Sequence, residues 1–583
     1  MLLILAAAVL AACGGGDGAG SGTGADSGAL ATPAALERDL PEEDAVPVDY
    51  GSGPVGTASA VTETMKALSA DGDLAAAELT ASYRPTTLTR AAYNAGAFGP
   101  VFGWPIIPIH MVQLPDGRVL AYGSDDKGNQ GAKLHYAVWD PNWNPGAPGA
   151  APSPFQLLAN TTGTDIFCNT QVLLPRNGQV FMAGGDRTVN GIVNYAIADT
   201  NFFNPANNSL RREPTDMAYR RWYATAITNA RGEVVVLGGR DDRFYAGTAT
   251  KPATAETFSA TPEIYVPGTG WRTLANARSD GAFGELRDNG LYPKAFLAPD
   301  GRVVTITNDG LLYALDSSGS GSIARLNGQL PTTNWNTTAV MYAPGKILSA
   351  RGGKALSLID INGPQPVIKG GGALSTPRKY GFSTVLPDGT VWFNGGSANG
   401  NVLADAVYTT ELWNPATNAW RMTANASKPR LYHGNTMLLP SGAVVVGGGG
   451  APGPVIGMNA EVYFPPYFFN PNGTWATQPV IGSVTPQNFG LNATFTMQMS
   501  TWGAIDKVVM VRAGAVTHAF NNEQRRMELA FTQAGRTLTV KAPARATEMP
   551  PGYYMVFALR KNPQAPAADN RLVPSEAKIV KLS

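Results

Sequence analysis

The sequence predicts an all-β protein in which a seven-bladed β-propeller is followed by a small β-sandwich. Three observations predict this fold class. The 583 residues include 67 glycines and 44 prolines, a composition typical of many short strands joined by turns. A phrase of strand, glycine turn and strand recurs seven times along the middle of the chain. From about residue 476 the phrase stops, and a different set of alternating strands follows.

Composition also narrows the classes of function. With 44 Lys and Arg against 43 Asp and Glu, the net charge is +1, so the chain has no electrostatic attraction to nucleic acid or to an anionic membrane. Hydrophobic residues make up 44%, enough for domains with sizeable cores. Two cysteines are too few for a scaffold held by disulfides. We therefore expect a neutral globular protein with no nucleic-acid partner.

The N-terminal residues predict export. Residues 1–12 are wholly apolar, and Leu10-Ala11-Ala12-Cys13 resembles the cleavage site of a bacterial lipoprotein signal, in which Cys13 becomes lipidated. A plain secretory signal is the alternative. The segment after Cys13 is rich in glycine and serine, so residues 13–100 are predicted to form a flexible tether and stalk. The expected protein is lipid-anchored to the bacterial cell envelope or secreted, and touches a membrane only through its N-terminal lipid.

The repeated phrase predicts the blades. It consists of an apolar strand, a turn ending in glycine, a β-branched strand and usually a glycine pair, as in LPDGTVWFNGG. Its turn glycines are Gly117, Gly178, Gly232, Gly301, Gly345, Gly389 and Gly442. Each turn lies between apolar runs and predicts a β-hairpin. Units of about 50 residues made only of strands are typical of kelch-type propellers. We therefore expect seven blades over residues 101–475, since a β-solenoid would need a shorter and more regular repeat.

A propeller also predicts a ring of side chains at one mouth of its channel. The strand before each turn glycine should be innermost, so residues nine or ten positions before the glycines should lie at one level. These residues are Ile107/Pro108, Cys168, Tyr223, Tyr292, Trp335/Asn336, Tyr380 and Tyr432/His433. Tyrosines that only plug the channel are the alternative. Cys168, the only cysteine after the signal, lies at the same level as Tyr223 and Tyr432-His433, and this coincidence favours a functional ring.

Residues 476–583 predict an immunoglobulin-like β-sandwich, because short strands alternate with turn signals there. One of its turns, GAVTHAFNNEQRR, carries His518, the only histidine outside the propeller. Arg525 and Arg526 in this turn are predicted to brace the sandwich against the propeller. His110 and His135 fall outside the ring positions and are predicted to be structural.

Two histidines with phenolic oxygens form an N,O donor set that suits Cu(II) better than zinc. From about Phe102 to the C-terminus the chain resembles the radical-copper oxidases, the galactose oxidase and glyoxal oxidase family. The resemblance is carried, in the family's order, by the phrases FCNTQVLLP, RRWYATAI, RLYHGNTMLLPSGAVVVGGGG, THAFNNEQRR and PPGYYMVFAL.

The resemblance implies one copper ion and a protein-derived Cys-Tyr radical cofactor. Cys168 and Tyr223 would be joined by a thioether, and Tyr223 would be both a copper ligand and the radical site. His433 and His518 would be the imidazole ligands, and Tyr432 the axial phenolate and general base. The implied copper-dependent oxidase converts a primary alcohol or aldehyde to the aldehyde or acid and reduces O2 to H2O2. Its expected partners are O2 and a small alcohol, aldehyde or glycan, and it is expected to be a monomer.

The competing hypothesis is a non-catalytic kelch propeller that binds glycan or protein at the cell surface. The fold is compatible with both hypotheses, because fold alone does not decide function. Retention of all five site residues favours the oxidase, because a binding module that had lost its activity would have no reason to keep them.

Two departures from galactose oxidase affect the predicted site. In that enzyme a Trp shortly after a Gly-Gly pair stacks on the crosslinked ring, whereas Gly238-Gly239 here precede Arg240, and Tyr245 is the candidate replacement. The carbohydrate-binding domain at the front of galactose oxidase is not expected here, since residues 14–100 are interpreted as tether and stalk. Both departures favour a small aldehyde or a primary alcohol on a glycan over free galactose.

Overall fold

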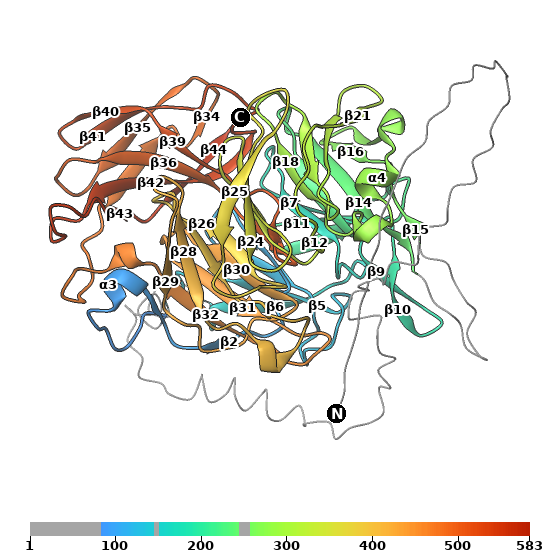
Figure 1. Ribbon diagram of the computed structural model, residues 1–583, viewed down its shortest axis with the longest axis horizontal. Coiled ribbons are helices and arrows are strands. Elements are labelled where there is room, and N and C mark those ends of the chain that lie inside the picture. Colours follow the sequence, from blue (N-terminus) through green and yellow to red (C-terminus); the bar gives the residue numbers. More distant parts are fainter. Residues whose placement is uncertain (1–82, 145–150, 244–256) are drawn as a thin grey trace, which may run out of the picture. The chain divides into compact units, whose positions relative to one another are not determined.

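Seven antiparallel sheets follow one another along the middle of the chain, one for each repeated phrase. The computed structural model describes residues 83–144, 151–243 and 257–583. In every sheet the hairpin around the turn glycine supplies two neighbouring strands. The all-β class and the seven-bladed propeller are therefore confirmed (Figure 1).

The first three blades are built in chain order. Blade 1 contains β3 (His110–Gln113), β4 (Val119–Tyr122), β5 (His135–Trp139) and β6 (Phe155–Ala159). Blade 2 contains β7 (Thr170–Leu173), β8 (Val180–Ala183), β11 (Thr200–Asn204) and β12 (Ser209–Arg212), beside a hairpin of β9 (Asp186–Val189) and β10 (Ile192–Ala196). Blade 3 contains β13 (Trp222–Thr228), β14 (Val234–Asp242), β16 (Glu263–Val266) and β17 (Gly270–Thr273), with β15 (Thr257–Phe258) on β14.

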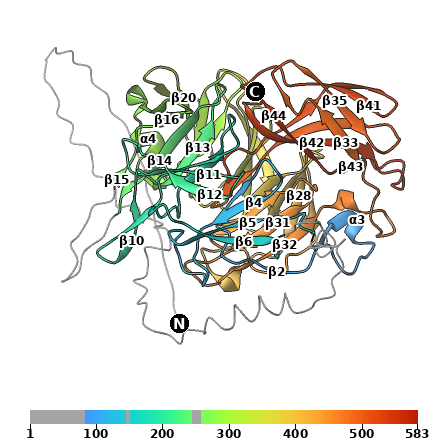
Figure 2. The ribbon, with the colours of Figure 1, turned by 180° about the vertical axis from the view of Figure 1, so that it is seen from behind.

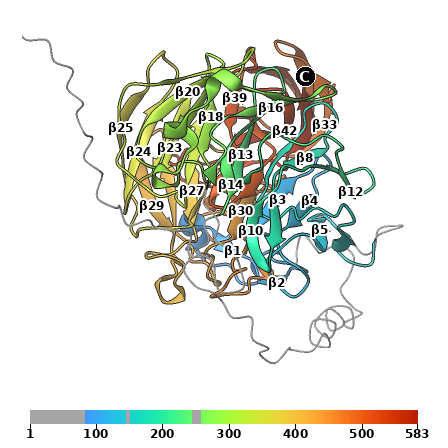
Figure 3. The ribbon, with the colours of Figure 1, turned by 90° about the vertical axis from the view of Figure 1, so that its right-hand side faces the viewer.

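The remaining blades repeat this order. Blade 4 contains β18 (Lys294–Leu297), β19 (Val303–Ile306), β20 (Leu312–Asp316) and β21 (Ser322–Arg325). Strands of blades 3 and 4 are turned toward the viewer in Figure 3. Blade 5 contains β22 (Ala339–Ala343), β23 (Lys346–Ala350), β24 (Ala355–Asp360) and β25 (Val367–Ala373). Blade 6 contains β26 (Phe382–Val385), β27 (Val391–Asn394), β28 (Thr410–Asn414) and β29 (Ala419–Thr423). Blade 7 contains β30 (Gly434–Leu438), β31 (Val444–Gly448) and β32 (Asn459–Phe464).

Burial falls from the first strand of a blade to the last. Strands such as β7, β13 and β18 are buried at every residue, whereas β12 and β21 are mostly exposed. The strand before the turn glycine is thus the inner one. Short helices lie in the connections: α3 (Ala92–Ala95), η1 (Ala275–Ala277), α4 (Asp280–Phe283), η2 (Leu286–Asp288), η3 (Leu403–Asp405) and η4 (Pro466–Phe468). In the described part of the chain, no helix is long and apolar enough to cross a membrane.

Blade 7 takes its outer strands from the other end of the chain. The strands β1 (Ala97–Phe98) and β2 (Phe102–Gly103) both pair with β32. Blades 1 and 7 share one apolar core, and their strands lie side by side in Figures 1 and 2. Tyr83 contributes to this junction, since its hydroxyl accepts a hydrogen bond from Trp139 Nε1 at 3.0 Å. The structure therefore places residues 83–100 on the propeller, whereas the sequence interpretation assigned them to the stalk. The signal, Cys13 and the rest of the tether lie outside the described residues.

The residues that enter the inner strands share an unusual backbone. Cys168, Tyr223, Tyr292, Tyr380 and His433 all have left-handed φ values, between 40° and 65°. Non-glycine residues adopt this conformation only where the surrounding structure holds them in it. Backbone hydrogen bonds run from blade to blade at this level, from Tyr223 N to Cys168 O (3.0 Å) and from Tyr292 N to Tyr223 O (2.7 Å).

The glycine pairs join neighbouring blades close to this ring. Gly185 N donates to Arg221 O at 3.0 Å, and Gly239 N donates to Gly290 O at 2.7 Å. Each acceptor precedes the ring tyrosine of the following blade by two residues. A Cβ atom at Gly184 would lie 2.2 Å from Arg221 O, so only glycine permits this approach.

Two sheets form the C-terminal sandwich around a core of their own. One contains β33 (Ile481–Thr485), β35 (Thr494–Met499), β41 (Thr537–Lys541) and β40 (Phe531–Ala534). The other contains β34 (Asn488–Phe489), β44 (Lys578–Leu582), β42 (Gly552–Lys561), β36 (Lys507–Arg512), β39 (Arg526–Leu529) and β43 (Leu572–Pro574).

The segment between β36 and β39 leaves the sandwich and joins the propeller. Its strands β37 (Ala515–Thr517) and β38 (Phe520–Asn521) extend blade 1, with Thr517 opposite His110 on β3. Glu523 Oε1 accepts from Thr228 N of blade 3 at 2.8 Å, and Arg526 Nε donates to Pro387 O, in the turn between β26 and β27 of blade 6, at 2.9 Å. Arg525, by contrast, donates to Glu548 O within the sandwich at 2.9 Å. Contacts with three blades thus hold the 513–526 segment in the propeller.

Candidate metal centre

Four donor atoms from three parts of the chain meet in the propeller. His433 and His518 approach each other with their Nε2 atoms 2.8 Å apart, and His518 Nε2 lies 3.1 Å from the Tyr223 hydroxyl. The hydroxyls of Tyr223 and Tyr432 are hydrogen-bonded to each other. All four side chains are at most 2% exposed. The structure therefore brings together the four residues that the sequence predicted as metal ligands.

Hydrogen bonds fix both imidazoles in the same tautomer. His433 Nδ1 donates to the Gly450 carbonyl at 2.8 Å. Thr517 Oγ1 donates its hydrogen to Ile109 O at 3.1 Å, so it accepts from His518 Nδ1 at 2.5 Å. Both Nε2 atoms therefore point a lone pair at the same spot.

The chemistry of this donor set fits a copper ion. The two Nε2 lone pairs, on atoms 2.8 Å apart, repel each other, and a cation bound between them would remove this repulsion. Two imidazole nitrogens and two phenol oxygens are the mixed N,O ligands that Cu(II) accepts, and the Nδ1 bonds supply the outer support common at metal-ligating histidines. His433, His518, Tyr223 and Tyr432 are the residues that would hold the ion.

Burial keeps the imidazoles neutral. Desolvation lowers the pKa of His433 to about 3. It lowers the pKa of His518 well below the usual value, with smaller contributions from His433, His110 and Lys294. A neutral imidazole keeps the lone pair that a metal needs.

Cys168 lies at the edge of this cluster. Its Sγ atom is 3.6 Å from His518 Nε2, and the side chain is fully buried. The ligand atoms of Cys168, His433 and His518 all lie within 4.8 Å of one another. The fifth predicted site residue is therefore beside the four donors.

Trp222 is the residue that the sequence analysis missed. Its ring stacks on Tyr223 with centroids 3.4 Å apart and planes 6° from parallel. The guanidinium of Arg240 lies 4.1 Å from the centre of the Trp222 ring. The candidate replacement for the stacking Trp, Tyr245, falls outside the described residues. Neighbouring side chains on a regular strand point to opposite faces, but the left-handed φ of 65° at Tyr223 breaks that alternation.

Other ring residues form the wall of the site. Tyr292 stacks on His518 with centroids 4.6 Å apart, and Tyr380 lies 4.9 Å from Tyr432. Trp335 lies 5.3 Å from Tyr223. These aromatic rings enclose the donor atoms in an apolar surrounding.

His110 also belongs to the surroundings of the site, although its position in the repeat gave no sign of it. It lies edge-on to His518 with ring centroids 5.6 Å apart, and it stacks on Tyr122 at 4.5 Å. Its Nδ1 bonds Gln171 Oε1 at 2.9 Å. His135 lies in the outer part of blade 1, where its Nδ1 is 3.9 Å from an Asp126 oxygen.

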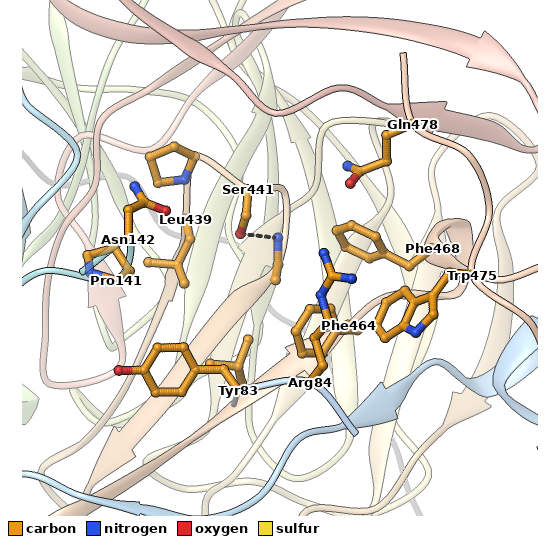
Figure 4. Close-up of a pocket in the computed structure, with 13 residues that line it drawn as sticks. Tyr83, Arg84, Pro141, Asn142, Leu439, Ser441, Phe464, Phe468, Trp475 and Gln478 are labelled. Atoms are coloured by element: carbon orange, nitrogen blue, oxygen red, sulfur yellow. Dashed lines mark hydrogen bonds between the residues drawn. The ribbon is translucent and has the colours of Figure 1, made fainter. Parts of the chain in front are cut away.

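Two cavities are distinct from the donor cluster. The pocket of Figure 4 is lined mainly by apolar residues such as Tyr83, Phe464 and Trp475, and none of the five predicted site residues lines it. A second cavity of about 190 Å³ lies beside the ring, where Asn336 and Lys379 are among its lining residues.

The family described as "Galactose oxidase-like, Early set domain" matches residues 478–582. The C-terminal domain is therefore similar to the domain that this family model describes. A "Galactose oxidase" of Gibberella zeae is 26% identical over 516 residues, covering 82% of this chain and 70% of that protein. "Aldehyde oxidase GLOX1" of Arabidopsis thaliana is 23% identical over 459 residues, covering 68% of this chain and 69% of that protein.

A solved structure has the same fold. It is described as a novel fungal alcohol oxidase with catalytic diversity among the AA5 family, in complex with copper. The match covers 84% of this chain and 100% of that chain, with a TM-score of 0.68 and 22% identity. The family model and these relatives confirm the resemblance to the galactose oxidase and glyoxal oxidase family.

Proposed function

We propose that the protein is a copper-radical oxidase, which converts a primary alcohol or aldehyde to the aldehyde or acid and reduces O2 to H2O2. The observation that carries the proposal is the approach of the His433 and His518 Nε2 atoms to 2.8 Å, beside the Tyr223 and Tyr432 hydroxyls. A propeller that only bound a glycan would have no need to bury two imidazole nitrogens and two phenol oxygens so close together.

Electron counting assigns complementary roles to copper and Tyr223. Oxidation of an alcohol removes two electrons and two protons. A copper ion held by His433, His518, Tyr223 and Tyr432 would polarise the substrate oxygen and would supply the acceptor for one of the electrons. The Tyr223 phenoxyl accepts the other together with a proton, as a hydrogen atom from the substrate carbon. Reoxidation passes two electrons and two protons to O2, which leaves as H2O2.

Tyr432 is the proposed general base. Its hydroxyl bonds that of Tyr223, and its ring stacks on His433 with centroids 3.8 Å apart. The Tyr432 oxygen is thus held next to the oxygen of the radical residue, where it can take the hydroxyl proton of the substrate. Burial of both rings excludes bulk water, which would otherwise quench a radical.

Cys168 is the proposed partner in the Cys168-Tyr223 radical cofactor. Formation of the thioether breaks the S–H bond of Cys168 and one ring C–H bond of Tyr223, and makes one C–S bond. The two electrons and two protons released go to O2. The protein then carries its own redox cofactor and needs no organic one.

The test is oxidation by the copper-loaded full chain. With a panel of alcohols, aldehydes and glycans we expect one bound copper per chain and peroxide release with at least one substrate. His518→Ala should abolish both, whereas His135→Ala, which changes the histidine of the outer strand, should leave both unchanged. The panel also separates an alcohol oxidase from an aldehyde oxidase. Copper binding without peroxide from any substrate would contradict the proposal and favour the binding propeller.

A further inference from the structure

A buried cation lies behind the proposed radical residue. Tyr223 occupies one face of the Trp222 ring at 3.4 Å, so the Arg240 guanidinium, at 4.1 Å from the same ring, lies on the other face. Trp222 and Arg240 are direct partners in the pairing of β13 with β14, so the two strands fix this stack. Arg240 is 1% exposed.

We propose that Arg240, acting through Trp222, raises the potential at which Tyr223 is oxidised and confines the radical to Tyr223. Arg240 is a positioning residue in this proposal, since it touches neither substrate nor metal ligand. The inference rests on the proposed function and adds a determinant of its redox chemistry.

The first step of the argument is the overlap of the two rings. At 3.4 Å and 6° the π systems of Trp222 and Tyr223 are in contact over their faces. One-electron oxidation of Tyr223 transfers an electron to the oxidant and breaks no bond, which leaves an electron-deficient ring. An indole is itself oxidisable, so this stack on its own would let the missing electron be shared between the two residues.

The second step is the charge of Arg240. A guanidinium stays protonated at every relevant pH. Its attraction to the electron-rich face of Trp222 is a cation–π contact, and the loss of an electron from that ring would turn this attraction into repulsion. Because the group is buried, solvent screens the repulsion only weakly. Removal of an electron from either ring is therefore less favourable, and least favourable from Trp222, which lies nearer to the cation.

Two features hold the guanidinium in this place. Gly239 passes so close to Arg221 that a Cβ would lie 2.9 Å from the Arg221 Cβ, which presses β14 against the start of β13. Arg240 Nη2 also contacts Asn194 O at 3.5 Å. The cation thus belongs to the framework of blade 3.

The experiment compares the wild-type chain with Arg240→Met, which removes the charge, and Arg240→Lys, which keeps a cation. Each copper-loaded protein is first checked for the two-hydrogen mass loss of the crosslink. It is then equilibrated with ferricyanide and ferrocyanide at a fixed ratio, and the radical is measured by its absorption and electron paramagnetic resonance. We expect about a tenfold higher ratio of radical to reduced protein in Arg240→Met, equivalent to a fall of about 59 mV for one electron. Arg240→Lys should restore most of the wild-type ratio.

A second readout locates the radical. Deuteration of the tryptophan rings should leave the resonance line shape of the wild type unchanged and alter that of Arg240→Met. Adding Trp222→Phe to the Arg240→Met variant should remove this isotope effect. If Arg240→Met does not fold, Arg240→Gln replaces it.

The outcomes separate the two proposals. If the crosslinked variants keep a ratio of radical to reduced protein within about twofold of wild type and show no isotope effect, the role of Arg240 is overturned and the proposed function is not affected. Failure of the wild type to lose two hydrogens would overturn the proposed function, and this inference with it.

Discussion

The backbone amide of Tyr223 donates a hydrogen bond to the carbonyl oxygen of Cys168 across the boundary between blades 2 and 3, with N and O 3.0 Å apart. Both residues have left-handed backbones, with φ of 65° and 55°. The framework of the propeller therefore sets the relative placement of the thiol and the phenol.

Gly184 is predicted to be essential for the close contact between blades 2 and 3. Gly184 and Gly163 have nearly the same φ, 76° and 77°, but only at Gly184 would a Cβ lie 2.2 Å from a backbone atom, the Arg221 oxygen. Alanine at either position costs about 1 kcal/mol for the left-handed backbone. Only Gly184→Ala adds the clash with the Arg221 oxygen, so we expect it to lower the melting temperature clearly more than Gly163→Ala. Equal shifts would show that the contact with Arg221 is unimportant.

Thr517 is predicted to set the copper affinity through His518. Without its hydroxyl, His518 loses the acceptor that orients Nε2 toward the metal. Thr517→Val should weaken copper binding by about 10- to 100-fold in a competition titration. Thr225→Val is the control, because the Thr225 hydroxyl is buried and has no hydrogen-bond partner in the structure. The interpretation fails if both variants bind copper alike.

Lys294 is predicted to destabilise the metal-free protein in a pH-dependent way. Burial lowers the pKa of Lys294 to about 7 from 10.5, its Nζ lies 5.0 Å from the centre of the Phe520 ring, and no hydrogen bond satisfies it. His518 also faces it. Between pH 7 and 10.5 the unfolded chain binds more protons than the folded chain, so the free energy of unfolding rises with pH across that window. Below pH 7, burial of Lys294 lowers the free energy of unfolding by its full amount, roughly 3 to 5 kcal/mol.

The melting temperature at several pH values checks this sign. Lys294→Met should stabilise the protein most at pH 6 and progressively less toward pH 10, while exposed Lys354→Met should change little at any pH. A gain from Lys294→Met that does not depend on pH would point to packing in place of charge.

Glu523 is predicted to anchor the segment that carries His518. Its carboxylate pairs with buried Arg512 and accepts from Thr228 N at 2.8 Å. Glu523→Gln leaves Arg512 without its counter-charge. We therefore expect the free energy of unfolding to fall by about 3 kcal/mol and copper to bind more weakly. The control is Glu576→Gln, which changes an exposed carboxylate outside this segment. Loss of stability without any loss of copper affinity would mean that His518 is positioned independently of this ion pair.

The sequence predicted the blades and most of the ring because both depend on a repeated local pattern. Turn glycines mark each hairpin, and the residues nine or ten positions earlier, such as Cys168 and Tyr223, enter the inner strand at one level. The closure of blade 7 by Ala97–Phe98 escaped prediction, since a two-residue strand carries no periodic signal.

Two neighbours of the site escaped prediction for physical reasons. Trp222 was overlooked because regular strand alternation directs it away from Tyr223, and the left-handed turn that reverses this depends on contacts between blades. His110 was assigned a structural role from its place in the repeat. Its contact with His518 arises only because a segment of the sandwich pairs with β3, a long-range contact that local sequence does not encode.

The central claim is the thioether between Cys168 and Tyr223, and intact-mass measurement tests it most directly. After copper loading and incubation in air, the full chain should lose two hydrogen atoms, and peptide mapping should assign the loss to a linked pair of peptides containing Cys168 and Tyr223. The Cys168→Ser variant should keep its mass under the same conditions. An unchanged mass in the wild type, or a crosslink mapped to other residues, would contradict the account.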